Sequence, residues 1–252
     1  MQATNNDAKL HQYKLLNNPI LLIFNTIALF FVSQFVASFV VIFVQKFSGG
    51  ETSQSLNTSL QFIYVVTADL LILFGVRMFL RKKGQTLKSV GMSKPQMSDV
   101  GKALLAYAGY LVIFMLTTII AKKISPSLNV DQQQQLGFEA NKGLVNLVLA
   151  GISLVILPPI VEETLCRGYL YTGLRSRYKI IPSAIITSIV FASAHLQFGS
   201  NAPLLWIAAI DTFVLSLVLV YLREKTGRLA ASMILHGIKN MIAFSLLFIF
   251  MK

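Results

Sequence analysis

The chain has 252 residues, of which 55% are hydrophobic and 13% are charged, and its mean hydropathy is +0.67. Soluble domains carry about 25% charged residues, so this composition excludes an ordinary soluble protein and predicts one that lies mostly in a lipid bilayer. The formal net charge of +12 does not indicate nucleic-acid binding, because no stretch interleaves basic and aromatic residues. In a membrane protein, Lys and Arg gather in cytoplasmic loops instead.

Seven apolar segments follow one another along the chain, and each is long enough to cross a bilayer as a helix. They comprise residues 18–46, 58–80, 102–121, 145–173, 181–198, 203–222 and 229–250. The first and fourth are long, and Pro158-Pro159 could divide the fourth, so eight spans are the alternative. We therefore expect an all-α polytopic transmembrane helix bundle of about seven spans.

The ends of the chain and its cysteine content add little. Residues 1–18 are polar and lack the apolar core and cleavage site of a secretory signal, so we expect the first apolar segment to stay in the membrane as an anchor. The single cysteine, Cys166, excludes an internal disulfide and is expected to be a small apolar filler.

Basic residues alternate between successive connections. One set is rich in them: Lys9 and Lys14, then Arg81, Lys82, Lys83, Lys88 and Lys94, then Arg175, Arg177 and Lys179, then Arg223, Lys225 and Arg228. The other connections carry only Lys46, Lys122, Lys123 and Lys142. The positive-inside rule then predicts a cytoplasmic N-terminus and, for seven spans, a C-terminus on the outside.

Ionisable side chains at membrane depth are costly and mark functional sites by default. The candidates are Glu162, Glu163, Arg167, His195, Asp211, His236 and Lys239, with Asn240 as a polar companion. At 1.5 Å per residue, Glu162, His195 and His236 each lie about 15–20 Å from the cytoplasmic end of a different helix. Because these three side chains lie at a similar depth on three different helices, we expect them to form a shared site.

Helical geometry divides these residues into pairs. Glu163 and Arg167 are four residues apart, so they share a face and can form an ion pair, which could also be purely structural. Glu162 is turned about 100° away and is free of that pair. His236 and Asn240 also share a face. Separately, Phe191 lies one turn before His195 and could pack beneath its imidazole.

This set of residues suits hydrolysis. Glu162 in an apolar surround is a candidate general base, and His195 could hold and help to deprotonate a water molecule. His236 and Asn240 could donate hydrogen bonds to a developing oxyanion. The alternative is a metal such as Zn²⁺, for which Glu162, Glu163, His195 and His236 would offer mixed oxygen and nitrogen ligands.

The two remaining charges in the membrane have simpler interpretations. Asp211 is expected to bond to a neighbouring helix rather than to join the site. Lys239 lies off the face of His236 and Asn240, so we expect it to form a pair or to extend its ammonium group toward water.

Three short motifs occur in order on three apolar segments. EETLCRGYLY at 162–171 fits EExxxR, FASAH at 191–195 fits FxxxH, and HGIKN at 236–240 fits HxxxN. Together they resemble the CPBP family, which comprises type II CAAX prenyl endopeptidases and bacterial bacteriocin-processing or self-immunity proteins, often labelled Abi. The resemblance covers roughly residues 145–250 and implies a CAAX-protease-like catalytic core at 141–252. Residues 1–140 match only in being hydrophobic, and their apolar segments and basic residues predict an N-terminal transmembrane region with a cytoplasmic basic loop.

The resemblance also implies roles for the motif residues. Glu162 and His195 would activate the water, and His236 and Asn240 would stabilise the oxyanion. Glu163 and Arg167 would support the first Glu. Members of the family are described both as metalloproteases and as metal-independent glutamate proteases, so both mechanisms stay open.

These observations favour an intramembrane endopeptidase that cleaves a membrane-associated protein or peptide. We expect an integral protein of a bacterial cell membrane, whose partners are the lipid bilayer and such a substrate. The alternative is a non-catalytic immunity or scaffold protein that binds a bacteriocin or a signalling partner. A proton-coupled transporter is disfavoured, because the chain shows no repeated halves or paired broken helices.

Overall fold

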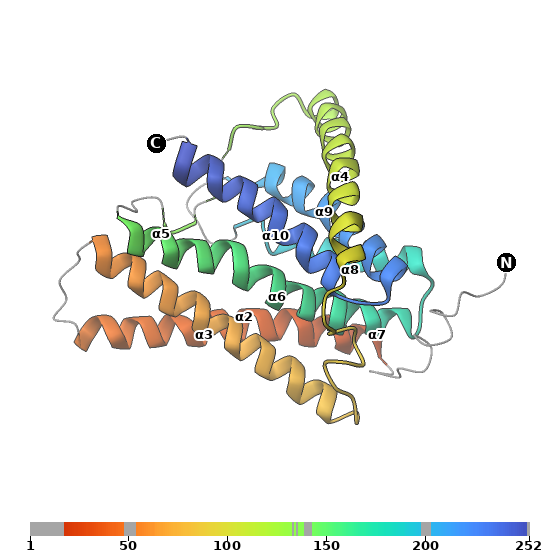
Figure 1. Cartoon of the computed structure of the whole chain (residues 1–252), viewed down its shortest axis with the longest axis horizontal. Coiled ribbons are helices and arrows are strands. Elements are labelled where there is room, and N and C mark those ends of the chain that lie inside the picture. Colours follow the sequence, from red (N-terminus) through yellow and green to blue (C-terminus); the bar gives the residue numbers. More distant parts are fainter. Residues whose placement is uncertain are drawn as a thin grey trace.

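The computed structural model describes residues 18–47, 54–132, 134, 136–138, 143–197 and 203–250. Within these ranges every regular element is a helix, which confirms the all-α prediction. The elements in chain order are α2 (Pro19–Phe47), α3 (Gln54–Arg81), α4 (Met97–Ile124), α5 (Leu144–Gly151), η1 (Ile152–Ile156), α6 (Leu157–Glu163), η2 (Thr164–Tyr171), α7 (Thr172–Arg175), α8 (Ile180–Ser193), α9 (Trp206–Thr226), α10 (Ala230–Ser245) and η3 (Leu246–Phe250), the η elements being π-helical (Figure 1).

One long helix lies at the centre of the bundle. The elements from α5 to α7 join end to end as a single helix, Leu144–Arg175, which we call the central helix. The α2–α3 pair packs against it from one side, while α8, α9 and α10 cover it from others. α4 packs on α9 and α10 and stands at a steep angle to the other long helices (Figure 1). The predicted site residues therefore come from the centre of the bundle and its immediate neighbours.

Among the residues that the structure describes, six helices are long and apolar enough to cross a membrane. They are Pro19–Phe47, Leu56–Arg81, Met97–Ile124, Leu144–Arg175, Trp206–Thr226 and Ala230–Phe250, and each overlaps one of the seven predicted segments. Neither long segment is divided among the described residues, because α2 is continuous and the two prolines are accommodated within the central helix. The eight-span alternative is therefore not seen.

The predicted segment 181–198 forms a shorter helix than expected. α8 has 14 residues, about 21 Å of helix, and ends at Ser193. The Ser193 hydroxyl donates to the Val190 carbonyl, which competes with the helical backbone bonds. The chain then turns at Gln197, whose φ is +52°. An apolar run does not reveal this early end, since the hydrophobic residues continue to Leu196.

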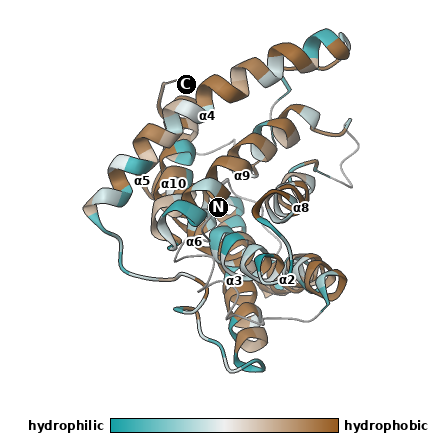
Figure 2. Ribbon diagram, turned by 90° about the vertical axis from the view of Figure 1, so that its right-hand side faces the viewer, coloured by the Kyte–Doolittle hydropathy of each residue, from teal (hydrophilic) through white to brown (hydrophobic). Residues whose placement is uncertain are grey.

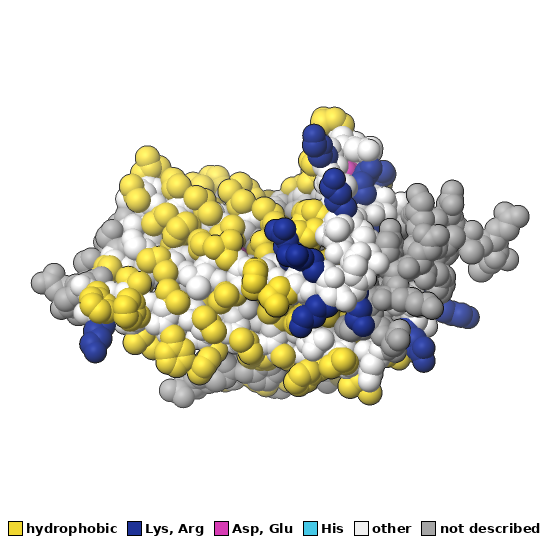
Figure 3. Space-filling view, turned by 90° about the horizontal axis from the view of Figure 1, so that it is seen from below, with side chains coloured by type: hydrophobic (Ala, Val, Ile, Leu, Met, Phe, Trp, Pro, Cys, Tyr) yellow, Lys and Arg dark blue, Asp and Glu magenta, His cyan; other side chains and the backbone are white. Residues whose placement is uncertain are grey.

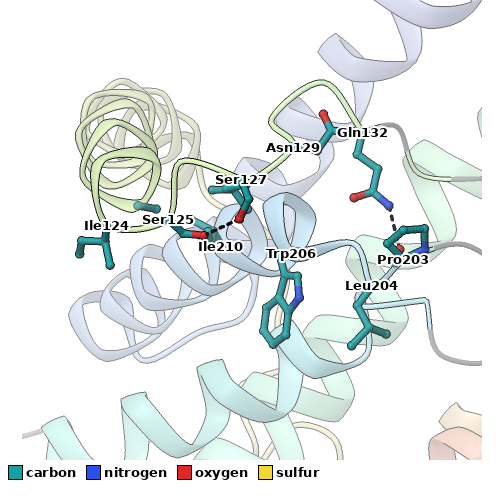
Figure 4. A pocket seen from close by; sticks show the side chains of 11 residues that line it. Ile124, Ser125, Ser127, Asn129, Gln132, Pro203, Leu204, Trp206 and Ile210 are labelled. Carbon is teal, nitrogen blue, oxygen red and sulfur yellow. Dashed lines mark hydrogen bonds between the residues drawn. The ribbon is translucent and has the colours of Figure 1, made fainter.

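The chain nevertheless reaches the opposite end of the bundle before α9 begins. Gln132, which follows α4, donates to the carbonyl of Pro203 at 2.8 Å. The end of α4 and the start of α9 together line a cavity of about 820 Å³ that includes Trp206 (Figure 4). At the other end of α9, Arg223 donates to the carbonyl of Val90. α9 therefore runs in the same direction as the central helix, whose last residue, Arg175, pairs with Glu224 near the end of α9.

The surface is inside-out relative to a soluble protein. Large apolar side chains of α2 are exposed, including Phe24, Phe35 and Phe43, whereas Thr26 and Ser33 of the same helix are buried. Hydrophobic residues make up much of the length of the helices (Figure 2). Small and polar residues at helix contacts and apolar residues outside are the pattern of a bundle in lipid. The protein is therefore an integral membrane protein.

Basic side chains gather at one end of the bundle, where α3, α4, α9 and α10 meet the α3–α4 loop. Arg228 forms an ion pair with Asp99 at 2.7 Å, and Arg175 with Glu224 at 2.6 Å. Other Lys and Arg side chains lie over part of one face, beside a largely hydrophobic surface (Figure 3). That this end faces the cytoplasm stays a prediction. Lys9, Lys14 and Lys142, on which it partly rests, lie outside the described residues.

Candidate active site

The two adjacent glutamates lie in α6, a short α-helical stretch between two π-helical turns of the central helix. The Leu157 N–H donates to the carbonyl of Ile152, five residues earlier, which is the π-helical spacing. The next two residues, Pro158 and Pro159, have no N–H to donate. π-Helical turns inside an α-helix occur frequently at functional sites. The sequence therefore forces an irregular backbone about one turn before Glu162.

Asn240 compensates for this irregularity. In an α-helix the carbonyl of Leu154 would accept from residue 158, and in a π-helix from residue 159, but both are prolines. The side-chain Nδ2 of Asn240 in α10 donates to that carbonyl at 3.0 Å. One N–H of the amide is therefore used to join α10 to the central helix. The oxyanion role predicted for Asn240 would fall to its second N–H.

Glu163 and Arg167 form the ion pair that the helical spacing predicts. Arg167 Nη1 lies 2.9 Å from Glu163 Oε1, and both side chains are 0% exposed. The same carboxylate oxygen accepts from Nδ1 of His236, on α10, at 3.1 Å. A carboxylate, a guanidinium and an imidazole thus form one buried network. This network fixes the ring of His236 and the rotation of α10 relative to the central helix.

Glu162 stands apart from the ion pair, as predicted. Its Oε2 lies 3.8 Å from Nε2 of His236, on the opposite side of the ring from Glu163. That oxygen is buried and has no hydrogen-bond partner among the described residues, while the whole side chain is 31% exposed. A buried carboxylate oxygen is costly without a partner, so its position calls for a proton donor. Glu162 is therefore placed to accept a hydrogen bond from something not part of the fold.

His195 lies just beyond the end of α8 rather than within a helix. Its Nδ1 is 2.9 Å from the carbonyl of Phe191. A carbonyl can only accept, so Nδ1 carries the proton and Nε2 of the neutral ring has a free lone pair. The imidazole also interacts electrostatically with Glu162. The geometry leaves one nitrogen of His195 available as a proton acceptor.

Phe191 joins the components of the site. Its ring packs against the His195 ring, 4.8 Å between centroids, as the sequence predicts. It also meets the His236 ring edge-on, with 6.1 Å between the two ring centroids. Cζ of Arg167 lies over the Phe191 ring, 4.3 Å from the ring centroid. An arginine over an aromatic face gains a cation–π attraction. The aromatic ring of the second motif therefore supports residues of the other two.

The structure thus brings the three motifs together. Glu162, Glu163 and Arg167 on the central helix meet His236 on α10, and His195 approaches from the end of α8. The site residues do not line the cavity of about 820 Å³ at the end of α4, nor another of about 500 Å³ at the end of α3.

Comparison with known proteins bears on this arrangement. Residues 144–242 match the family model described as "Type II CAAX prenyl endopeptidase Rce1-like". The match covers less than half of the chain, so it shows a similarity of this segment to that family. The Rce1-like segment contains all three motifs and every predicted site residue.

The chain is also similar to a curated protein of Escherichia coli described as "Uncharacterized 24.3 kDa protein". The two are 30% identical over 139 residues, which cover 54% of this chain. The match spans 57% of that relative, less than two thirds of its length. No solved structure matches the chain.

One acidic residue near the candidate site was not predicted from the sequence. Asp69 lies in the middle of α3, and its Oδ2 is buried without a hydrogen-bond partner in the described part of the chain. Its charge interacts with that of Glu162. The neighbouring residues Ala68 and Ile72 are buried, so this part of α3 packs inside the bundle. Asp69 stands alone in the apolar run VVTADLLILF, which is the signal that could have identified it.

Asp211 and Lys239 behave as predicted and form a separate pair. Lys239 Nζ lies 3.0 Å from Asp211 Oδ2, and Tyr110 of α4 donates to the other oxygen of the same carboxylate. Asp211 therefore bonds to two neighbouring helices rather than to Glu162 or His195. Cys166 is also as expected, a buried side chain in the apolar core beside the site.

The predicted zinc ligands do not converge as a metal site. Among the described residues, no group of three or more His, Cys, Asp or Glu side chains is arranged to hold a metal ion. Glu163, one of the four predicted ligands, has its Oε1 engaged by both Arg167 and His236. Binding zinc through it would compete with a fully buried ion pair. In this arrangement the residues do not fit a zinc centre.

Proposed function

We propose that this protein is an intramembrane endopeptidase that hydrolyses a peptide bond in a membrane-associated protein or peptide. The observation that carries the proposal is the buried Oε2 of Glu162, which no described residue hydrogen-bonds and which lies 3.8 Å from Nε2 of His236. A base with no partner in the fold suits a group that must bind water and take its proton. The similarity of residues 144–242 to the Rce1-like family model supports the same reaction class.

In the proposed reaction, a water molecule lies between Glu162 and His195. The free lone pair on Nε2 of His195 accepts one hydrogen bond from this water and orients it. The Glu162 carboxylate takes the second proton as the water oxygen attacks the peptide carbonyl. Glu162 then returns the proton to the leaving amine nitrogen, which restores the carboxylate and completes the cleavage.

His236 and Asn240 are proposed to stabilise the oxyanion. Because Nδ1 of His236 donates to Glu163, Nε2 can donate to the substrate only when both ring nitrogens carry protons. In that state His236 and Arg167 carry two positive charges, and Glu162 and Glu163 carry two negative ones. The charges then balance within a largely buried site, which limits the cost of removing them from water.

The substrate class follows from the surroundings of the site. The reacting groups lie on helices whose outer faces are apolar and suited to lipid, so a substrate held in the membrane reaches them most directly. Leader peptides of secreted peptides, or membrane-bound regulatory proteins, are the substrates that we propose.

The test is an assay of the purified protein in proteoliposomes with quenched fluorescent peptides that carry a membrane-spanning segment. We expect the wild type to release fluorescence and both Glu162→Ala and His195→Ala to be inactive. Equal inactivity of all three proteins, together with cellular phenotypes that survive both substitutions, would favour the non-catalytic immunity or scaffold function instead.

Activity is expected to persist after removal of metal ions. No three potential ligands converge among the described side chains, and Glu163 is engaged by Arg167 and His236. The measurement is peptide cleavage after dialysis against a chelator, with the residual metal content determined on the same sample. Loss of cleavage that returns on addition of Zn²⁺, but not of Mg²⁺, would show that zinc is required.

Replacing Asp69 tests whether its charge matters to the reaction. Its charge repels that of Glu162 in a poorly solvated site, so removing it should not weaken Glu162 as a base. Its buried Oδ2 has no hydrogen-bond partner among the described residues, so we expect Asp69→Asn and Asp69→Leu both to keep their activity within about threefold. A tenfold loss in both variants would instead assign a role to the charge itself.

A further inference from the structure

A second site candidate lies at the end of α3, away from the glutamates. A cavity of about 500 Å³ opens between the last turns of this helix and the loop that follows it. Three basic side chains line it, namely Arg77, Arg81 and Lys88, and all three are exposed. Leu80 and Leu87 provide apolar walls. The cavity thus combines concentrated positive charge with an apolar surface.

The loop that forms one wall is held in place by the backbone and by the rest of the bundle. Gln85 N–H donates to the Leu80 carbonyl at 2.9 Å, and Met92 N–H to the Leu87 carbonyl at 3.0 Å. Leu229 N–H, at the start of α10, donates to the carbonyl of Gly91. The loop is therefore tied both to α3 and to the start of α10. These hydrogen bonds fix the backbone of the loop that carries Lys88 beside the end of α3.

Within the described ranges, none of the three basic side chains has an acidic partner. Arg77, Arg81 and Lys88 take part in none of the ion pairs among the described residues, and no Asp or Glu of that part of the chain lines the cavity. The nearest acidic residue of the loop–α4 junction, Asp99, is bound to Arg228. Three such cations around one cavity favour an anionic ligand that can accept several hydrogen bonds.

The position along α3 indicates what kind of anion this is. Leu70, Phe74, Arg77 and Arg81 are spaced by four, three and four residues, so they follow one face of the helix. Leu70 and Phe74 are 62% and 61% exposed. The face is therefore apolar within the span and cationic at its end, where Arg81 is the last residue of the helix. A phospholipid would match this face, with its acyl chain beside the apolar residues and its phosphate beside the basic ones.

The side of the bundle that carries this face is visible in two views. The C-terminal end of α3 lies at the lower edge of the bundle in Figure 1, and Figure 3 shows Lys and Arg side chains beside hydrophobic ones from that side.

We propose that the cavity binds the phosphate of an anionic glycerophospholipid between Arg77, Arg81 and Lys88, with an acyl chain along Leu70 and Phe74. Juxtamembrane basic residues attract anionic lipid, and long basic side chains extend toward the headgroup level.

Native mass spectrometry of the detergent-solubilised protein, titrated with phosphatidylglycerol or phosphatidylcholine, tests this proposal. The test variant is Arg81→Gln/Lys88→Gln. The matched control, Lys82→Gln/Lys83→Gln, removes the same charge from the same stretch of chain but from residues that do not line the cavity. We expect the test variant to bind phosphatidylglycerol at least about tenfold more weakly, at roughly 1 kcal/mol per basic residue, and the control to stay within twofold. Equal losses in both variants would overturn the proposal.

Two further binding experiments distinguish a lipid from a free phosphate. Millimolar inorganic phosphate should not displace bound phosphatidylglycerol, and the long-chain lipid should bind more tightly than the dihexanoyl form because it alone reaches Phe74. Displacement by phosphate, or equal binding of both chain lengths, would overturn the lipid assignment. The inactive variant Glu162→Ala should bind the lipid like the wild type, so this outcome is independent of the proposed peptidase function.

Discussion

Glu162→Gln is expected to reduce the rate of peptide cleavage by about 10²–10⁴-fold, the range typical of a lost general base. Glutamine keeps the size of the side chain but cannot take a proton from water. Glu162 Oε2 has no hydrogen-bond partner among the residues that the structure describes, so the substitution removes no hydrogen bond between helices. It weakens only the 3.8 Å contact with Nε2 of His236, a distance too long for a hydrogen bond. The free energy of unfolding should therefore change little. The substitution should therefore abolish most of the cleavage activity while leaving the stability of the protein nearly unchanged.

Glu162→Asp provides the matched control for that experiment. Aspartate retains the carboxylate but withdraws it by one methylene group from the water position, so we expect cleavage between that of the wild type and that of Glu162→Gln. Rates are measured with saturating and limiting peptide, so that kcat and KM are resolved. Cleavage by Glu162→Gln within threefold of the wild type would exclude Glu162 as the base.

Helical spacing was sufficient to predict part of the site. Residues four apart on a helix share a face, so the Glu163–Arg167 pair and the separation of Glu162 from it follow from local geometry alone. The packing of Phe191 on His195 follows for the same reason. These relations involve neighbours on one segment, and tertiary packing has little freedom to alter them.

Relations between helices were harder to predict. The binding of His236 to Glu163 depends on the rotation of α10 about its axis, which no local pattern determines. The early end of α8 depends on the Ser193 hydroxyl and a turn at Gln197 inside an otherwise apolar run. Periodicity could not distinguish this from a full span.

Two features were readable in the sequence and were still missed. Pro158-Pro159 removes the N–H groups that would bond to the Leu154 carbonyl, so a donor from another helix was required, and Asn240 supplies it. Asp69 lies deep in an apolar segment, which already identifies it as a candidate functional residue. In both cases a polar group inside the membrane, the Leu154 carbonyl or the Asp69 carboxylate, needed a partner, and this need could be inferred from the sequence.

Glu163→Leu is expected to destabilise the protein by about 3–5 kcal/mol, the cost of leaving a buried charge without its partner. Arg167 is 0% exposed, and its Nε and Nη2 have no hydrogen-bond partner within the described ranges, so Glu163 provides its main compensation apart from the Phe191 ring. His236 would lose its acceptor as well. The measurement is reversible unfolding in mixed detergent micelles, followed by circular dichroism.

The double variant Glu163→Leu/Arg167→Met decides whether this loss comes from an unpaired charge or from lost packing. Replacing both partners by apolar residues of similar size removes the buried charge, so the double variant should be more stable than Glu163→Leu alone. It should nevertheless be inactive, because His236 no longer has the carboxylate that orients its ring. A double variant less stable than either single one would mean that the two side chains stabilise the bundle independently. The ion pair would then not be the reason that both charges are kept inside the membrane.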